Sequence, residues 1–134
     1  MLLDLTLGTN DLQRSIRFYD AIFAILCVDR LEDDDGWAGW GKSNDDGVSL
    51  WLCPPFDGKP ATSANGSMLT FSAKNAAQVR AFHGAALANG GTDEGAPGIR
   101  ARYSPDFYVA YVRDPDGHKL CAVFPDHDPT RDRA

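Results

Sequence analysis

Residues 5–23 read LTLGTNDLQRSIRFYDAIF, and within this stretch a strand pattern gives way to a helix pattern. Apolar and polar side chains alternate from Leu3 to Leu7, which is typical of a strand that buries one face. Asn10 or Asp11 can then cap a helix, after which apolar residues recur at helical spacing. These residues are Leu12, Ile16, Tyr19, Phe23 and Leu26. The stretch therefore predicts a half-buried strand followed by an amphipathic helix.

The same pattern returns in the second half of the chain. Residues 68–72 alternate again, and residues 75–88 carry apolar side chains on one stripe before a Gly-Gly pair that can end a helix. Shifting the first half along the chain by 64 residues places Asp4 on Met68 and Phe18 on Phe82 without a gap. The two halves are therefore a weak internal repeat, each half starting with a strand and a helix.

Short runs rich in aromatic and β-branched residues follow the first helix and indicate three strands in a meander. The runs lie around Leu31, at 37–40 and at 48–53, with acidic turns at 33–36 and 44–47 between them. Near the other end, residues 107–113 and 119–124 flank the sequence Asp-Pro-Asp-Gly. This arrangement predicts a hairpin, because Pro and Gly supply the backbone angles of a turn. The whole chain thus predicts a βαβββ module written twice.

Composition limits the classes of protein to which the chain can belong. It has 134 residues, enough for one domain that folds without disulfides or metals, and a formal net charge of −6. That charge disfavours nucleic acid and anionic membrane surfaces as partners, because both are negative themselves. No apolar run reaches the roughly 18 residues of a membrane span, and the N-terminal residues lack the pattern of a signal peptide. The cysteines, Cys27, Cys53 and Cys121, have no CxxC spacing, so we expect free thiols in a cytoplasmic protein.

The stretch at 5–23 and VRDPDGHKLCAVF at 112–124 together resemble the glyoxalase/bleomycin-resistance/dioxygenase family of the vicinal oxygen chelate superfamily, in its single-domain branch. The resemblance covers nearly the whole chain. It implies an α+β fold in which two tandem βαβββ modules form a curved, incompletely closed barrel-like sheet around a cavity. The implied domain spans 1–125, with module one at about 1–58, module two at about 64–125 and a charged C-terminal tail at 126–134. It also implies a homodimer.

Metal-dependent members of this family hold a divalent ion with a His on the first strand of each module and a Glu on the last strand. In this chain those positions fall on Asp4, Met68 and Cys121, and a fourth ligand position falls on Leu50 or Trp51. Divalent ions such as Mg²⁺, Mn²⁺, Fe²⁺ and Zn²⁺ prefer imidazole and carboxylate over a thioether or a neutral thiol. We therefore expect no metal cofactor, and a divalent metal is disfavoured.

Several residues are candidates for a site in the implied cavity. Strand alternation turns Asp4 away from its apolar neighbours and toward the implied cavity. A desolvated carboxylate there could act as a general base; a purely structural hydrogen-bonding role is the alternative. Aromatic side chains and an Arg suit an anionic or planar ligand, because guanidinium pairs with carboxylate and stacks on rings. For most of these residues, core packing is the competing role. The predicted ligand-binding residues are Thr6, Trp37, Met68, Thr70, Arg102, Tyr103, Tyr108 and Cys121.

The leading hypothesis is a protein without a metal centre that binds a small organic ligand, anionic or aromatic, in its cavity. A first alternative is an enzyme of lyase, isomerase or dioxygenase type that uses Asp4 in metal-free or atypical-metal chemistry. A second is a dimeric interaction module without a functional cavity. Whether the chain is an enzyme stays open, since it resembles lactoylglutathione lyases and dioxygenases but departs from them at the metal positions.

Overall fold

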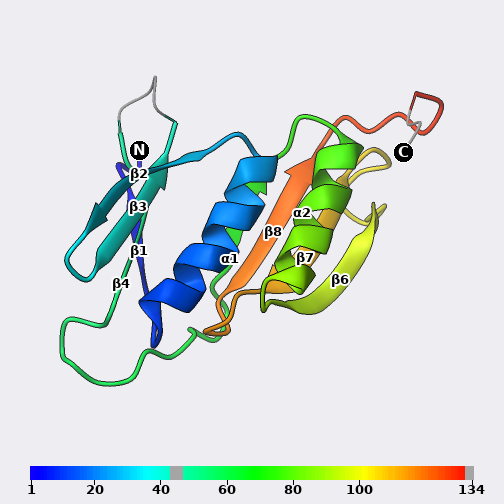
Figure 1. Ribbon diagram of the computed structural model, residues 1–134. Coiled ribbons are helices and arrows are strands. Elements are labelled where there is room, and N and C mark those ends of the chain that lie inside the picture. The colour runs from blue at the N-terminus through cyan, green and yellow to red at the C-terminus, as the bar shows by residue number, and fades with distance from the viewer. Residues whose placement is uncertain (43–46, 132–134) are drawn as a thin grey trace.

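The computed structural model describes residues 1–42 and 47–131, and Figure 1 shows two groups of elements, one from each half of the chain. The first group is β1 (Leu5–Gly8), α1 (Leu12–Ile25), β2 (Asp29–Asp34), β3 (Trp37–Gly41) and β4 (Leu50–Cys53). The second is β5 (Leu69–Ser72), α2 (Ala76–Ala88), β6 (Thr92–Ile99), β7 (Tyr108–Arg113) and β8 (Lys119–Phe124). This order confirms the predicted βαβββ module and its repetition. Most of the turn expected at 44–47, and the last part of the tail at 132–134, lie outside the described residues.

The repeat seen in the sequence holds in the structure. The offset that carries the start of β1, Leu5, onto the start of β5, Leu69, also carries the helix cap Asp11 onto Asn75. Each cap accepts a hydrogen bond from the backbone N–H three residues further on, at 3.1 Å and 2.8 Å. Local sequence therefore starts both helices in the same way.

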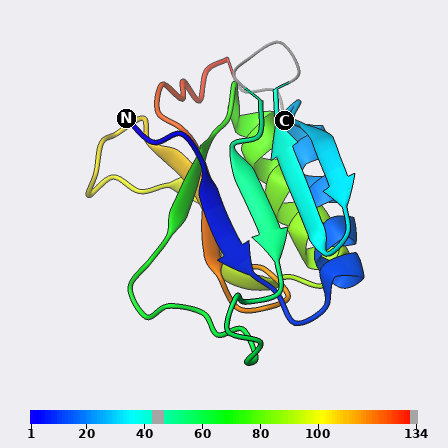
Figure 2. The ribbon, with the colours of Figure 1, turned by 90° about the vertical axis from the view of Figure 1, so that its left-hand side faces the viewer.

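Each module forms its own four-stranded mixed sheet, in the order β1-β4-β3-β2 and β5-β8-β7-β6. β1 runs parallel to β4, and Figure 2 shows these two strands pointing the same way; β5 is parallel to β8. In the first sheet Thr6 lies opposite Trp51, and in the second Thr70 lies opposite Cys121. The predicted α+β class with two βαβββ modules is confirmed.

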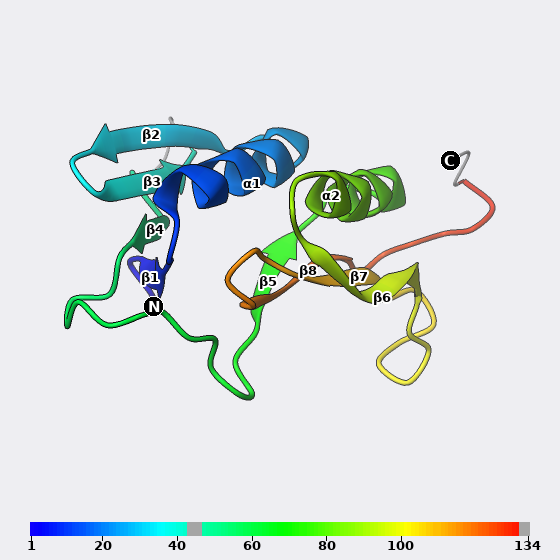
Figure 3. The same cartoon turned by 60° about the horizontal axis from the view of Figure 1, so that its bottom comes forward.

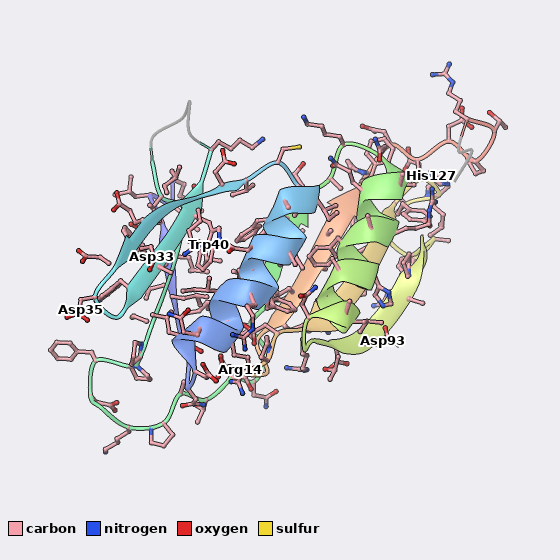
Figure 4. All side chains as sticks on the ribbon, in the orientation of Figure 1. Arg14, Asp33, Asp35, Trp40, Asp93 and His127 are labelled. Carbon is pink, nitrogen blue, oxygen red and sulfur yellow. The ribbon has the colours of Figure 1, made fainter. Side chains whose placement is uncertain are left out.

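Each helix covers one face of the sheet in its own module, and the two helices pack against each other (Figure 3). The main core lies on these covered faces, where Phe18 and Phe82 are fully buried at repeat-related positions. Trp40 of β3 points toward α1 (Figure 4), and its indole Nε1 donates to the Asp20 carboxylate at 2.9 Å. In the described part of the chain, no helix covers the opposite face of either sheet. We call these the open faces.

The turn between β7 and β8 joins the two modules through Asp116, whose side chain is 1% exposed. Its Oδ2 accepts hydrogen bonds from the hydroxyls of Thr9, at 2.6 Å, and Ser15, at 3.0 Å. Its Oδ1 accepts from the Asn10 backbone N–H and from Arg14 Nη2, both at 2.9 Å. Burial by itself would raise the pKa of Asp116, but these hydrogen bonds and the Arg14 charge outweigh it and hold that pKa below its ordinary value.

The predicted hairpin is present around the same turn. The Gly117 N–H donates to the Asp114 carbonyl at 2.9 Å, and Gly117 has a φ of 91°, which favours glycine. His118, which follows the turn, is buried, and its Nε2 lies 2.8 Å from the Gly8 carbonyl oxygen in the first module. The hairpin therefore contributes contacts to both modules.

The two helices end with the same backbone geometry but different residues. After α1, the Val28 N–H donates to the Phe23 carbonyl at 2.9 Å, and after α2 the Gly91 N–H donates to the Ala86 carbonyl at 2.8 Å. The residue before each donor has a positive φ: 61° for Cys27 and 95° for Gly90. A cysteine thus occupies a left-handed position where the second module has glycine.

Neither described helix has the length and apolar composition needed to cross a membrane.

Candidate ligand pockets on the open faces

The open face of the second sheet carries a row of side chains from three adjacent strands. Thr70 lies opposite Cys121, Cys121 opposite Tyr111, and Tyr111 opposite Gly95. Directly opposed residues in a sheet project to the same side, so these side chains share the face that α2 does not cover. Lys119 is two residues from Cys121 on β8 and therefore projects to the same side.

A pocket of about 290 Å³ lies on this face, and we call it the basic pocket. It is lined by Met68, Glu94, Arg100, Arg102, Tyr103, Tyr111 and Lys119. The guanidinium carbon of Arg100 and the ammonium of Lys119 lie 5.6 Å and 5.3 Å from the centre of the Tyr111 ring. The Arg102 guanidinium carbon lies 5.1 Å from the centre of the Tyr103 ring. Cations and aromatic rings are therefore packed against one another around the pocket.

The positive charge of the basic pocket is largely uncompensated. Glu94 is already paired with Arg113, which also donates to the Gly117 carbonyl at 2.8 Å. Among the residues that the structure describes, Arg100, Arg102 and Lys119 form no ion pair with a carboxylate. Their gathering is notable in a chain of net charge −6. Such a pocket attracts anions, because bringing an anion here relieves repulsion among the cations.

Cys121 lies beneath the surface of the same open face and is 1% exposed. Its Sγ donates to the Thr70 hydroxyl at 3.3 Å, and its neighbours are Val109, Val123 and Tyr111 in a small apolar cluster. Burial raises the pKa of the Cys121 thiol, with partial opposition from Thr70 and from the charge of Lys119. A buried, protonated thiol is a poor nucleophile and a poor metal ligand.

The three residues at the family's metal positions do not fit a divalent ion. Asp4 precedes β1 and is exposed, Met68 is 45% exposed, and Cys121 is a buried thiol. Within residues 1–42 and 47–131, no group of three His, Cys, Asp or Glu side chains is placed to hold a metal. The donor set is therefore one exposed carboxylate, one thioether and one protonated thiol, which is unsuited to hard and borderline ions. That the chain works without a metal stays a prediction.

The desolvated environment expected for Asp4 is not present in the described chain. The residue precedes the first strand, and its side chain is exposed to solvent. Its carboxylate is therefore surrounded by water and is not enclosed by other side chains. The catalytic role of Asp4 stays a prediction without structural support from a closed pocket.

A second pocket, of about 430 Å³, lies on the open face of the first sheet, and we call it the aromatic pocket. It is lined by Thr6, Gly8, Trp37, Cys53, Pro54, Pro55, Phe56, Asp57, Pro60 and Thr62. Burial raises the pKa of the Cys53 thiol. The loop that follows β4 forms the rim of this pocket.

Seven of the eight predicted ligand-binding residues lie on the open faces. Thr6 and Trp37 line the aromatic pocket, and Met68, Arg102 and Tyr103 line the basic pocket. Thr70 and Cys121 lie on the same open face as the basic pocket. The ligand-binding role of each stays a prediction.

Tyr108 lies on the other side of its sheet. It belongs to the main core beneath α2, its hydroxyl accepts from Arg80 Nη1 at 3.2 Å, and its ring centre is 4.6 Å from that of His127. Four residues that line the basic pocket are absent from the predicted ligand-binding residues: Glu94, Arg100, Tyr111 and Lys119. The alternation that places Cys121 on the open face would have placed Lys119 there as well.

Two βαβββ modules, each with one helix-covered face and one open face, define a protein with the glyoxalase fold. The model of the Glyoxalase/Bleomycin resistance protein/Dioxygenase superfamily matches residues 2–122. The chain belongs to this superfamily.

Solved structures agree with this assignment. A glyoxalase/bleomycin resistance protein from Albidiferax ferrireducens is 38% identical, with a TM-score of 0.80 over 96% of this chain and 99% of that chain. A glyoxalase/bleomycin resistance protein/dioxygenase family enzyme from Burkholderia phytofirmans is 20% identical, with a TM-score of 0.69 over 92% and 98%. The fosfomycin resistance protein FosX from Mesorhizobium loti is 13% identical, with a TM-score of 0.67 over 97% and 94%. The last two show similarity of fold alone. Comparison with curated proteins gives no significant match.

Proposed function

We propose that this protein binds a small organic anion that carries a planar ring, and that the basic pocket is the binding site. The observation that carries the proposal is the convergence of Arg100, Arg102 and Lys119 with two tyrosine rings in one pocket of about 290 Å³. None of these cations is paired with a carboxylate of the described chain.

The chemistry of the pocket suits both parts of such a ligand. Guanidinium groups bind carboxylates through charge-assisted, bidentate hydrogen bonds, and their planar faces stack on rings. Burial raises the pKa of Tyr111, so its phenol stays protonated and available as a hydrogen-bond donor at neutral pH. The pocket volume is close to the lower end of ordinary small-molecule sites, which favours a single-ring compound.

Binding, rather than metal-assisted conversion, fits the residues present. The donor atoms at Asp4, Met68 and Cys121 do not suit a divalent ion, so we include the absence of a resident metal in the proposal. Elemental analysis of protein purified without chelators tests this part. About one transition metal per chain, lost in an Asp4→Ala, Cys121→Ala double variant, would contradict it.

We also propose that the protein is a homodimer. β1 and β5 are edge strands of their sheets, and exposed apolar residues precede each of them: Leu2 and Leu3 before β1, and Met68 before β5. Unpaired strand edges next to exposed apolar side chains are surfaces that proteins commonly cover with a partner. Sedimentation equilibrium distinguishes a dimer from a monomer.

We also propose a cytoplasmic location. All three cysteines are free, which is the state that a reducing compartment maintains.

Calorimetric titration with benzoate and with its neutral isostere benzamide tests the binding proposal. We expect benzoate to bind and benzamide to bind at least about tenfold more weakly, since a hydrogen bond to a charged group contributes about 1.5–3 kcal/mol. Arg102→Ala should weaken benzoate binding by a similar factor. Lys74→Ala, which removes an exposed cation next to the N-cap of α2, is the matched control and should change nothing. Equal affinity for both compounds, or no binding of benzoate, would contradict the proposal.

The same titrations, repeated with Ni²⁺, Mn²⁺ or Fe²⁺ and followed by product analysis, address the enzyme alternative. Turnover of a bound compound that disappears in Asp4→Ala would favour an enzyme over a binding protein.

A further inference from the structure

We propose that the aromatic pocket on the open face of the first sheet is a second, separate site, and that it binds a small organic cation of the quaternary ammonium type. The proposal goes beyond the anion site and does not depend on it. It stands on the shape of the pocket, the aromatic side chains in it and the charge around it.

The rim of the pocket is held in place by the chain itself. Asn10 and Ala61 exchange two hydrogen bonds: Asn10 Nδ2 donates to the Ala61 carbonyl at 3.0 Å, and the Ala61 N–H donates to Asn10 Oδ1 at 2.7 Å. The Gly58 N–H also donates to the Pro55 carbonyl at 3.0 Å. A Cβ on Gly8 would lie 3.2 Å from the Ala61 side chain and 3.3 Å from that of Pro55, so the rim packs closely on the strand. The pocket is therefore formed before any ligand arrives.

Aromatic side chains stand exposed in this pocket. Trp37 is 45% exposed and is held by an edge-to-face contact with Trp51, whose ring centre lies 5.9 Å away. Phe56 on the rim is fully exposed, at 108%. Exposed Trp and Phe rings beside prolines lose apolar hydration when a ligand covers them, and the face of an indole ring attracts cations most strongly.

The charge around the pocket is negative. Asp57 lines it, and no Lys, Arg or His is among its described lining residues. Glu32 lies opposite Gly39 and Asp34 opposite Trp37 in the β2–β3 register, so both carboxylates project onto the same open face. Neither forms an ion pair within the described part of the chain. Lys59, the nearest cation in sequence, is not among the residues that line the aromatic pocket; it lines an adjoining hollow that shares Pro54, Pro55 and Pro60 with that pocket.

These features together select one chemical class. An aromatic wall with carboxylates near it stabilises a bulky, weakly hydrated cation through cation–π attraction and long-range electrostatics. An anion would be repelled by Asp57, Glu32 and Asp34. The two open faces of the chain are therefore of opposite electrostatic character, although the modules that carry them repeat the same fold.

Choline and its neutral carbon isostere 3,3-dimethylbutan-1-ol are the probes, and both calorimetry and tryptophan fluorescence report binding. We expect choline to bind about 3- to 30-fold more tightly than the alcohol, which is the range of a cation–π contact. Trp37→Leu should reduce choline affinity by a similar factor, whereas Trp37→Phe should retain most of it. In the wild type the Lys59 N–H donates to Asp57 Oδ1 at 2.9 Å. Asp57→Asn removes the charge but keeps a side-chain oxygen that can accept this hydrogen bond, so it should weaken binding of choline and not of the alcohol.

Arg102→Ala, in the basic pocket, is the matched control and should leave choline binding unchanged. Melting curves of each variant establish that it is folded. Equal affinity for choline and the alcohol, no response to Trp37→Leu, no choline binding, or loss of binding in Arg102→Ala would each overturn the proposal.

Discussion

The hydroxyl of Tyr19 in α1 donates a hydrogen bond of 2.6 Å to Asp114 Oδ2 at the end of β7, so a buried phenol and a buried carboxylate from different modules meet. The other oxygen of Asp114 accepts the backbone N–H groups of Asp116 and His118, each at 2.9 Å. Burial raises the pKa of Tyr19 well above its ordinary value, and the charge of Asp114 raises it further. The Tyr19 hydroxyl therefore stays protonated, and donates to the Asp114 carboxyl group, throughout the neutral pH range.

Removing this hydroxyl should destabilise the protein. Tyr19→Phe leaves the Asp114 carboxylate buried with one partner fewer, which costs about 1–3 kcal/mol in the free energy of unfolding. Urea denaturation of the wild type and the variant measures the difference. Tyr103→Phe, at an exposed tyrosine, is the matched control and should change stability by less than about 0.5 kcal/mol. An equally small effect of Tyr19→Phe would show that the link contributes little.

The stability that Asp116 contributes should depend on pH with a defined sign. Its folded-state pKa lies below its unfolded value, so its contribution is present above the unfolded pKa and is lost as the pH falls through the folded pKa. We expect Asp116→Asn to cost about 2–4 kcal/mol at pH 7, because the buried groups around it lose a charged partner. The difference from the wild type should shrink below about pH 4, where the carboxyl of the unfolded chain becomes protonated.

Asp114 should show the opposite dependence. Burial raises the pKa of Asp114, against the opposing effects of Tyr19 and His118. The folded-state pKa therefore lies above the unfolded pKa, and protonation of this carboxyl stabilises the folded state as the pH falls from the first value toward the second. Urea denaturation of Asp114→Asn and Asp116→Asn between pH 3 and 7 separates the two groups. Parallel pH profiles for both variants would contradict the assignment.

The parts of the fold that depend on neighbouring residues could be predicted from the sequence. The cap of the first helix, expected at Asn10 or Asp11 and found at Asp11, and the turn ending at Gly117 are local signals, and each acts in the structure as its pattern indicates. The role of Asp116 is not local, because its partner Thr9 lies 107 residues away and the sequence pattern of a turn says nothing about that distance. Such a contact depends on how the modules pack.

The candidate sites were partly predictable for the same reason. Alternation along a strand sorts its residues into two sets, and the sets on β7 and β8 separate Cys121 and Lys119 from Tyr108 in the structure. Alternation alone does not say which set faces a helix, so it left open whether Tyr108 lines a cavity or packs in the core, where the structure places it. The cation character of the basic pocket also depends on Glu94 being paired with Arg113, which joins two different strands.

Replacing Cys27 by glycine should stabilise the protein. Cys27 has a φ of 61° in the turn after α1, a conformation that costs any residue with a Cβ, and the equivalent position after α2 is Gly90. We expect Cys27→Gly to raise the free energy of unfolding by about 0.5–1 kcal/mol, and Gly90→Ala to lower it by a similar amount. Cys27→Ala, which keeps the Cβ, is the control for loss of the thiol and should be near neutral. Destabilisation by Cys27→Gly in urea titrations would refute this reading of the turn.

The three thiols should react at very different rates with a disulfide reagent such as Ellman's reagent. Cys27 is exposed, whereas Cys53 and Cys121 are buried, and burial raises the pKa of both buried thiols. Because the thiolate is the reactive form, one thiol per chain should react quickly in the native protein and the other two only as the chain unfolds. Cys27→Gly should abolish the fast phase without altering the slow one. A fast phase that persists in this variant would mean that Cys53 or Cys121 is accessible, and loss of that phase in Cys121→Ser would identify Cys121 as a reactive group on the open face.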